Sequence, residues 1–137
     1  MHRAMFILLA SATCYSQPGP IDLLFDGGNT AVVRGLDVSG NLAVWSSDGI
    51  IYGKDIHSDS PYFVICNDPG EQMYPKTDGR YVAWVSNKTD GNFTEPFDEI
   101  KCFDVLNSKQ RLIAGYSASY GYYRPQIDCG KIVYNVA

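Results

Sequence analysis

The sequence has little of what metal centres and acid–base active sites need. Its 137 residues include two histidines and four cysteines, and no two cysteines form a C-x-x-C pair, so the spacing typical of a zinc site is absent. A G-x-S-x-G motif, which marks the nucleophile of many hydrolases, is also absent. We therefore predict no metal, no cofactor and no catalytic residue in this chain.

Basic clusters and long apolar runs are missing as well. The formal net charge is −4 and no basic run occurs, so nucleic acid is not an expected partner. No apolar run approaches the roughly 20 residues that a membrane-spanning helix needs. We expect no integral membrane segment once the N-terminal segment is removed, and we find no helical period outside that segment.

The N-terminus has the order of charges and apolar residues that is typical of a secretory signal. Residues 1–3 carry the positive charge, residues 4–10 are apolar, and small residues follow, with cleavage sites at 10–12 or 14–16. This order predicts a signal peptide over residues 1–16, and a secreted, periplasmic or cell-surface protein. An ordinary first strand and a lipidated cysteine are the alternatives.

Three cysteines would remain after signal removal, Cys66, Cys102 and Cys129. Because three is an odd number, at most one disulfide forms within the chain and one thiol is left over. The alternative, which we favour, is that the cysteines act as small apolar side chains buried in strands.

The most informative feature is an internal repeat. Residues 36–45 align with residues 75–84, and both segments carry a glycine before an apolar run that ends in Trp45 or Trp84. Residues 125–134 form a third copy, in which the glycine is shifted by one place and Tyr134 replaces the tryptophan. Self-similarity of this kind indicates a repeated structural unit.

Each copy predicts four short antiparallel strands. A tight turn at residues 39–41 or 78–80 separates the first strand from the second. The second strand is apolar on both faces, as in a sheet that lies between two others. The third strand ends at Asp55 or Asp104, and the fourth, which is short, lies at an outer edge. The prolines at positions 61, 75 and 125 are expected at strand beginnings, where a missing N–H is tolerated.

Four-stranded units repeating every 40 to 50 residues or so are typical of β-propeller blades. The pattern P-x-x-x-G-x-Y/L-V/A-A/V-W, followed by D-x-I-x-x-x-D-I/V, resembles the TolB-like six-bladed propeller repeat of periplasmic and cell-surface proteins, from about residue 21 onward. The resemblance implies an all-β, incomplete β-propeller of about two and a half four-stranded antiparallel blades, at about residues 30–66, 72–114 and 122–137. A small β-sandwich or meander is the alternative.

This count of blades predicts a fragment of a longer protein, in which residues 21–25 form the outermost strand of a further blade. A chain of this kind exposes blade faces at both ends. We expect it to self-associate through Leu42, Val44, Ile132 and Tyr134 and through the strand edge at residues 131–136.

The best binding candidate is the tyrosine-rich segment that precedes the third copy. Tyr with Ser and Gly supplies rigid contact area and adaptable hydrogen bonds. The candidate ligand-binding residues are Tyr116, Tyr120, Tyr122, Tyr123 and Arg124. The sequence thus favours a non-catalytic secreted or cell-surface propeller fragment that binds a protein or a glycan. The alternative is the propeller portion of a larger enzyme, a peptidase or a polysaccharide lyase, whose catalytic part lies elsewhere.

The other polar candidates are more simply structural. His57 lies among consecutive turn residues, and Asp55 and Asp104 are placed to accept backbone N–H bonds in the turns that follow them. Trp45 and Trp84 recur at one position of the repeat, which favours core packing. The insertion at residues 87–98 contains possible calcium ligands, Asp90, Asn92 and Glu95, and N-x-T sequons at Asn87 and Asn92, but a solvated hairpin loop explains it better.

Overall fold

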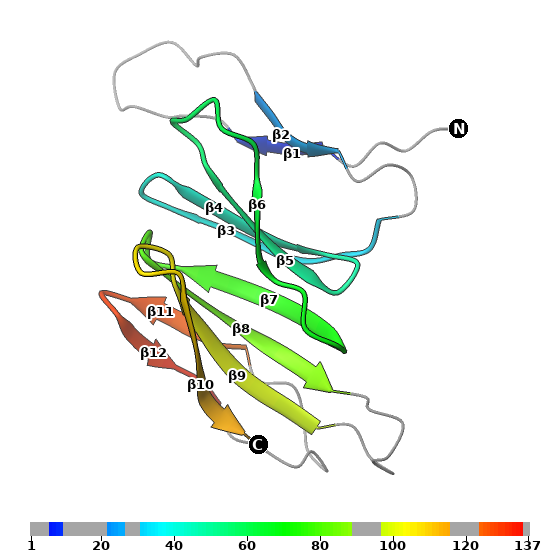
Figure 1. Ribbon diagram of the computed structural model, residues 1–137, viewed down its shortest axis with the longest axis vertical. Coiled ribbons are helices and arrows are strands. Elements are labelled where there is room, and N and C mark those ends of the chain that lie inside the picture. The colour runs from blue at the N-terminus through cyan, green and yellow to red at the C-terminus, as the bar shows by residue number, and fades with distance from the viewer. Residues whose placement is uncertain (1–5, 10–21, 27–30, 89–96, 116–123, 136–137) are drawn as a thin grey trace. The chain divides into compact units, whose positions relative to one another are not determined.

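The computed structural model describes residues 6–9, 22–26, 31–88, 97–115 and 124–135, and every regular element in these ranges is a β-strand (Figure 1). The all-β prediction is therefore confirmed. The chain divides into two compact units, residues 1–31 and residues 32–137. No element of the described ranges is a helix with the length and apolarity that a membrane span requires.

The described residues of the first unit form one antiparallel pair. Strand β1 (Phe6–Leu9) pairs with β2 (Asp22–Asp26), with a shift in register between Phe6 and Leu8. The strand β2 overlaps the segment that we expected to be a strand from the repeat pattern. The signal peptide over residues 1–16 stays a prediction.

In the second unit, the described residues form three antiparallel sheets, and within each sheet strands that follow one another in sequence are neighbours in space (Figure 1). The first sheet contains β3 (Val33–Ser39), β4 (Leu42–Ser47), β5 (Ile50–Asp55) and β6 (Phe63–Cys66). The second sheet contains β7 (Glu71–Thr77), β8 (Tyr81–Lys88), β9 (Phe97–Asp104) and β10 (Lys109–Gly115). The third sheet contains β11 (Gln126–Asp128) and β12 (Lys131–Val133).

Tight turns join the first two strands of each sheet where glycine was expected. Gly40 and Gly79 have φ values of 55° and 97°, which only glycine adopts without steric cost. In the third sheet the turn is Cys129-Gly130, both with positive φ, between the paired residues Asp128 and Lys131. A two-residue hairpin of this kind needs positive φ at both central positions, which accounts for the shifted glycine.

Bulges interrupt the first strands of the two large sheets. The register of β3 shifts between Val33 and Leu36, and that of β7 shifts between Met73 and Lys76. Pro75 lies within this second bulge, so the expectation that it begins a strand is wrong: a bulge leaves a residue unpaired and tolerates the missing N–H.

The first interface lies between the first and second sheets. Its buried cluster consists of Leu42, Val44, Ile51, Ile65 and Cys66 from the first sheet and Val82 and Trp84 from the second. The expectation that Leu42 and Val44 are exposed is wrong, because the second sheet covers them and leaves 4% and 0% of their surfaces accessible. Trp45 and Trp84 are both fully buried, which confirms them as core residues.

The second interface lies between the second and third sheets. Ile132 and Tyr134 pack against a buried cluster of Met73, Val85 and Ile100. Strand β8 is therefore covered on both faces, with Trp84 against the first sheet and Val85 against the third. This position as the middle layer explains why the β8 sequence shows no apolar–polar alternation.

Candidate binding surface

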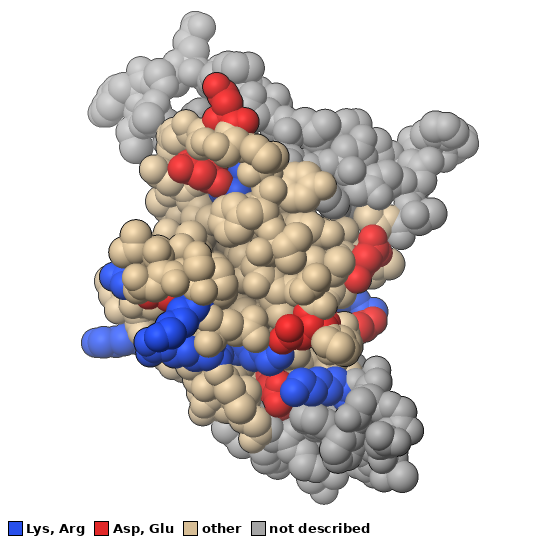
Figure 2. All heavy atoms as spheres, in the orientation of Figure 1, with Lys and Arg blue, Asp and Glu red and all other residues tan. Residues whose placement is uncertain are grey.

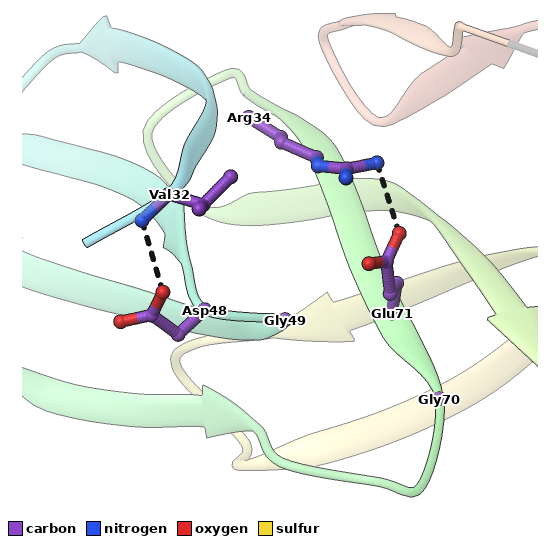
Figure 3. A pocket seen from close by; sticks show the side chains of 6 residues that line it. All are labelled: Val32, Arg34, Asp48, Gly49, Gly70 and Glu71. Carbon is purple, nitrogen blue, oxygen red and sulfur yellow. Dashed lines mark hydrogen bonds and ion pairs between the residues drawn. The ribbon is translucent and has the colours of Figure 1, made fainter. Parts of the chain in front are cut away.

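A cleft of about 280 Å³ opens at one end of the first two sheets (Figure 3). It is formed where β3 and β7 begin and where a turn joins β4 to β5. Its lining residues are Val32, Arg34, Asp48, Gly49, Gly70 and Glu71. Nothing in the repeat pattern predicted this cleft, because it lies between copies of the repeat rather than within one.

The cleft carries one cation and two carboxylates. Arg34 Nη1 lies 2.9 Å from Glu71 Oε2, and both side chains are about half exposed. The same guanidinium group donates to Met73 Sδ at 3.3 Å. Asp48 Oδ1 accepts the Val32 N–H at 2.9 Å, as Figure 3 shows. A polar ligand would meet donors and acceptors that are already oriented.

Backbone segments approach each other closely along the wall of this cleft. Gly49 has φ 78°, and its carbonyl oxygen accepts the Gln72 N–H at 3.1 Å. Gly70 has φ 96°, and a Cβ atom there would lie 2.1 Å from the Asn87 carbonyl oxygen. Because glycine is needed at Gly70 both for φ and for space, the shape of the cleft is fixed by the fold.

The predicted binding segment is attached to the same end of the second sheet. Cross-strand pairs run from Gly115, the last residue of β10, through Glu99 and Ser86 to Gln72, and Gln72 bonds Gly49 beside the cleft. The connection from β10 to β11 therefore leaves the second sheet on the row of residues that borders the cleft.

Of the five predicted site residues, the structure describes Arg124. Its guanidinium carbon lies 4.6 Å from the centre of the Tyr74 ring, a distance typical of a cation–π contact. Tyr74 follows Met73, which contacts Arg34. Arg34 of β3 and Arg124, which precedes β11, therefore contact neighbouring residues of β7. Tyr116, Tyr120, Tyr122 and Tyr123 lie outside the described residues.

The repeated aspartates are structural, as predicted. Asp55 Oδ1 accepts the His57 N–H at 2.9 Å in an exposed turn. Asp104 accepts N–H bonds from Leu106 and Asn107, and its Oδ2 lies 3.1 Å from Arg80 Nη2. The hydrogen-bonded Arg80 guanidinium, with help from Asn107, lowers the pKa of Asp104 to about 2.

The cysteines form no metal site in the described part of the chain. Cys66 and Cys102 are buried free thiols and Cys129 is an exposed one, and no three potential ligands cluster there. At the first sequon, Asn87 Nδ2 donates to the buried Asp98 at 2.8 Å. The candidate calcium ligands Asp90, Asn92 and Glu95 lie outside the described residues.

Comparison of the chain with family models, with curated proteins and with solved structures finds no match.

Proposed function

We propose that the second unit forms consecutive blades of a TolB-like β-propeller, two complete and one begun. Two four-stranded meanders and a hairpin are stacked in sequence order, which supports this architecture. Trp84, on the second strand of the second sheet, packs against the first sheet. Tyr134, at the equivalent place in the third copy, packs against the second sheet. Strand β8 is buried on both faces, which favours a stack of blades over a two-layer sandwich.

We further propose that this unit is a non-catalytic binding module of a secreted, periplasmic or cell-surface protein. One observation carries the proposal: Arg124, the last residue of the tyrosine-rich segment, stacks on Tyr74 of β7, the strand that begins at the cleft. Exposed loops on a rigid scaffold are where binding residues concentrate. Tyrosines, arginines and a polar cleft suit a glycan or a polar protein surface.

A glycan array probed with the whole chain tests this proposal. For the glycan that binds best, we expect Arg34→Ala and Arg124→Ala each to weaken binding by about tenfold or more, which is the range of interface residues that matter. Lys54→Ala is the matched control, because Lys54 bonds the Ser58 and Ser60 carbonyl groups in the β5–β6 loop, away from the cleft.

One result would count against the proposal. If both arginine variants bind as tightly as the unmodified chain, the cleft is not part of the binding surface. If no glycan binds, the same three variants are compared on a protein ligand identified by cross-linking at the cell surface, and the same order of affinities is expected there.

A further inference from the structure

A lysine is buried at the interface between the first and second sheets. Lys101 of β9 is 6% exposed, and it pairs across the strands with Trp84, which packs against the first sheet. On the neighbouring strand β10, the cations Lys109 and Arg111 are exposed, and Figure 2 shows basic side chains on the surface where these strands lie. Burial of a cation costs free energy unless the charge is paired and hydrogen-bonded.

The repeat does not require a lysine at this position. In the first copy the corresponding residue is Tyr52, which pairs with Trp45 as Lys101 pairs with Trp84. Replacement of a buried ion pair by apolar side chains of similar volume is often neutral or stabilising. The stability of the sheet therefore gives no reason for a charge here, and the reason is sought in what Lys101 contacts.

The partner of Lys101 is Asp68, in the connection between β6 and β7. Lys101 Nζ lies 2.6 Å from Asp68 Oδ2, and Gln110 Nε2 donates to the same oxygen at 3.1 Å. Glu99 Oε2 lies 3.8 Å from Lys101 Nζ. The hydrogen bond from Lys101, together with that from Gln110, lowers the pKa of Asp68, so this carboxyl is charged at neutral pH. The second sheet thus holds the connection through a charged contact.

The connection that is held in this way forms part of the wall of the binding cleft. Gly70 and Glu71 follow Asp68 closely in the sequence, and both line the cleft. The Asp68 carbonyl accepts a hydrogen bond from Gln72 Nε2 at 3.3 Å, and the Gln72 N–H donates to the Gly49 carbonyl in the same wall. The segment that carries Gly70 and Glu71 is therefore fixed at both of its ends.

We propose that Lys101 and Asp68 are positioning residues of the cleft: their ion pair fixes the β6–β7 connection and thereby sets where Glu71 holds Arg34. Neither residue is among those that line the cleft, so both act through the backbone of residues 68–71. The consequence for binding rests on the function proposed above, whereas the consequence for the geometry of the free chain does not.

The test begins with Lys101→Met, which removes the cation and keeps a long side chain that packs in apolar surroundings. Because the Asp68 side chain is 40% exposed, water can hydrate the carboxylate that remains, and we expect the chain to stay folded. In proton–nitrogen correlation spectra of the free chain, the Gly70 and Glu71 amide signals should shift. The Gln72 amide, which is bonded to Gly49, should exchange with solvent about tenfold faster because local opening becomes easier.

Two further variants separate positioning from general loosening of the interface. Lys76→Met is the matched control, because Lys76 also joins the two sheets, through Asp37 at 3.8 Å, but lies near the end of β7 that is away from the cleft. It should leave the amide signals of residues 70–72 unchanged. Asp68→Asn removes the other charge of the ion pair at a partly exposed position and should move the same signals as Lys101→Met. This variant decides the question if Lys101→Met does not fold.

Binding is measured with the glycan that binds best to the unmodified chain. Lys101→Met and Asp68→Asn should each weaken it about tenfold, and Lys76→Met should not. Unchanged affinity in both variants for a glycan that Arg34→Ala weakens would overturn the proposal.

The spectra of the free chain decide the proposal even without a ligand. Unchanged Gly70 and Glu71 signals in Lys101→Met and Asp68→Asn would overturn it, and so would an equal shift of these signals in Lys76→Met. Shifts confined to Lys101→Met and Asp68→Asn would support the positioning role, and if no glycan or protein then binds, the proposed function alone is wrong.

Discussion

The indole Nε1 of Trp84 donates a hydrogen bond of 2.9 Å to Oε1 of the buried Gln72. Gln72 in turn connects the second sheet to the first, because its N–H donates to the Gly49 carbonyl and its own carbonyl accepts from Ser46 Oγ at 2.5 Å. One network therefore joins the core tryptophan of the second sheet to the edge of the binding cleft.

Truncation of either tryptophan should be strongly destabilising. Trp84→Ala and Trp45→Ala each remove a fully buried indole, and we expect each to lower the free energy of unfolding by about 3–5 kcal/mol. Urea denaturation followed by circular dichroism measures this change. Red-shifted, readily quenched tryptophan fluorescence in the folded protein would contradict the core assignment.

The ion pair between Arg80 and Asp104 predicts a pH dependence. The folded pKa of Asp104, about 2, lies below the usual unfolded value of about 3.9. Its contribution to stability is therefore complete above the unfolded pKa and is lost as the pH falls from about 4 to about 2. Carboxyl NMR titration should show an Asp104 pKa that rises in Arg80→Ala and does not change in the control Arg34→Ala. An unchanged pKa in Arg80→Ala would show that the guanidinium group is not the cause.

Two glycines with positive φ should differ sharply in their tolerance of alanine. A Cβ atom at Gly70 would lie 2.1 Å from a backbone oxygen, whereas a Cβ atom at Gly40 would meet its nearest atom at 3.9 Å. Gly40→Ala carries only the backbone cost of about 1–2 kcal/mol. Gly70→Ala adds a clash with backbone and should cost clearly more, as measured by thermal unfolding. Equal costs would mean that the β6–β7 connection does not approach Asn87.

The thiols should react in an order set by burial. Burial raises the pKa of Cys66 and Cys102, and the neighbouring Asp128 carboxylate raises that of the exposed Cys129. In native protein, iodoacetamide should modify Cys129 while the other two remain protected until unfolding. Asp128→Asn should accelerate the reaction of Cys129 at neutral pH. Peptide mapping identifies each site, and early modification of Cys66 would contradict the packing of the first interface.

Local patterns in the sequence were sufficient to predict much of this fold. The glycines at positions 40 and 79 required positive φ, and the unbroken apolar run before Trp84 indicated a strand between two layers. The aspartate at position 104 was expected to cap a turn, and it does. These predictions succeeded because each depends on neighbours within a few residues.

The errors and omissions arise from contacts between distant segments. Leu42 and Val44 were expected to lie on an exposed face. Whether a face of a strand is exposed depends on which other sheet covers it, and the residues of the strand alone do not determine this. The bulge around Pro75 and the cleft beside Gly70 depend on how one copy meets the next. For the same reason, the tyrosine-rich segment predicted Arg124 as a binding residue but gave no indication of its contact with Tyr74.

The three sheets are stacked in sequence order, with the second sheet in the middle. NOE contacts in methyl-labelled protein test it most directly. We expect contacts from the Trp84 ring to the Leu42 and Val44 methyl groups, and separate contacts from the Tyr134 ring to the Val85 and Ile100 methyl groups. A second sheet with contacts on one face and solvent on the other would contradict the stack and favour a two-layer sandwich.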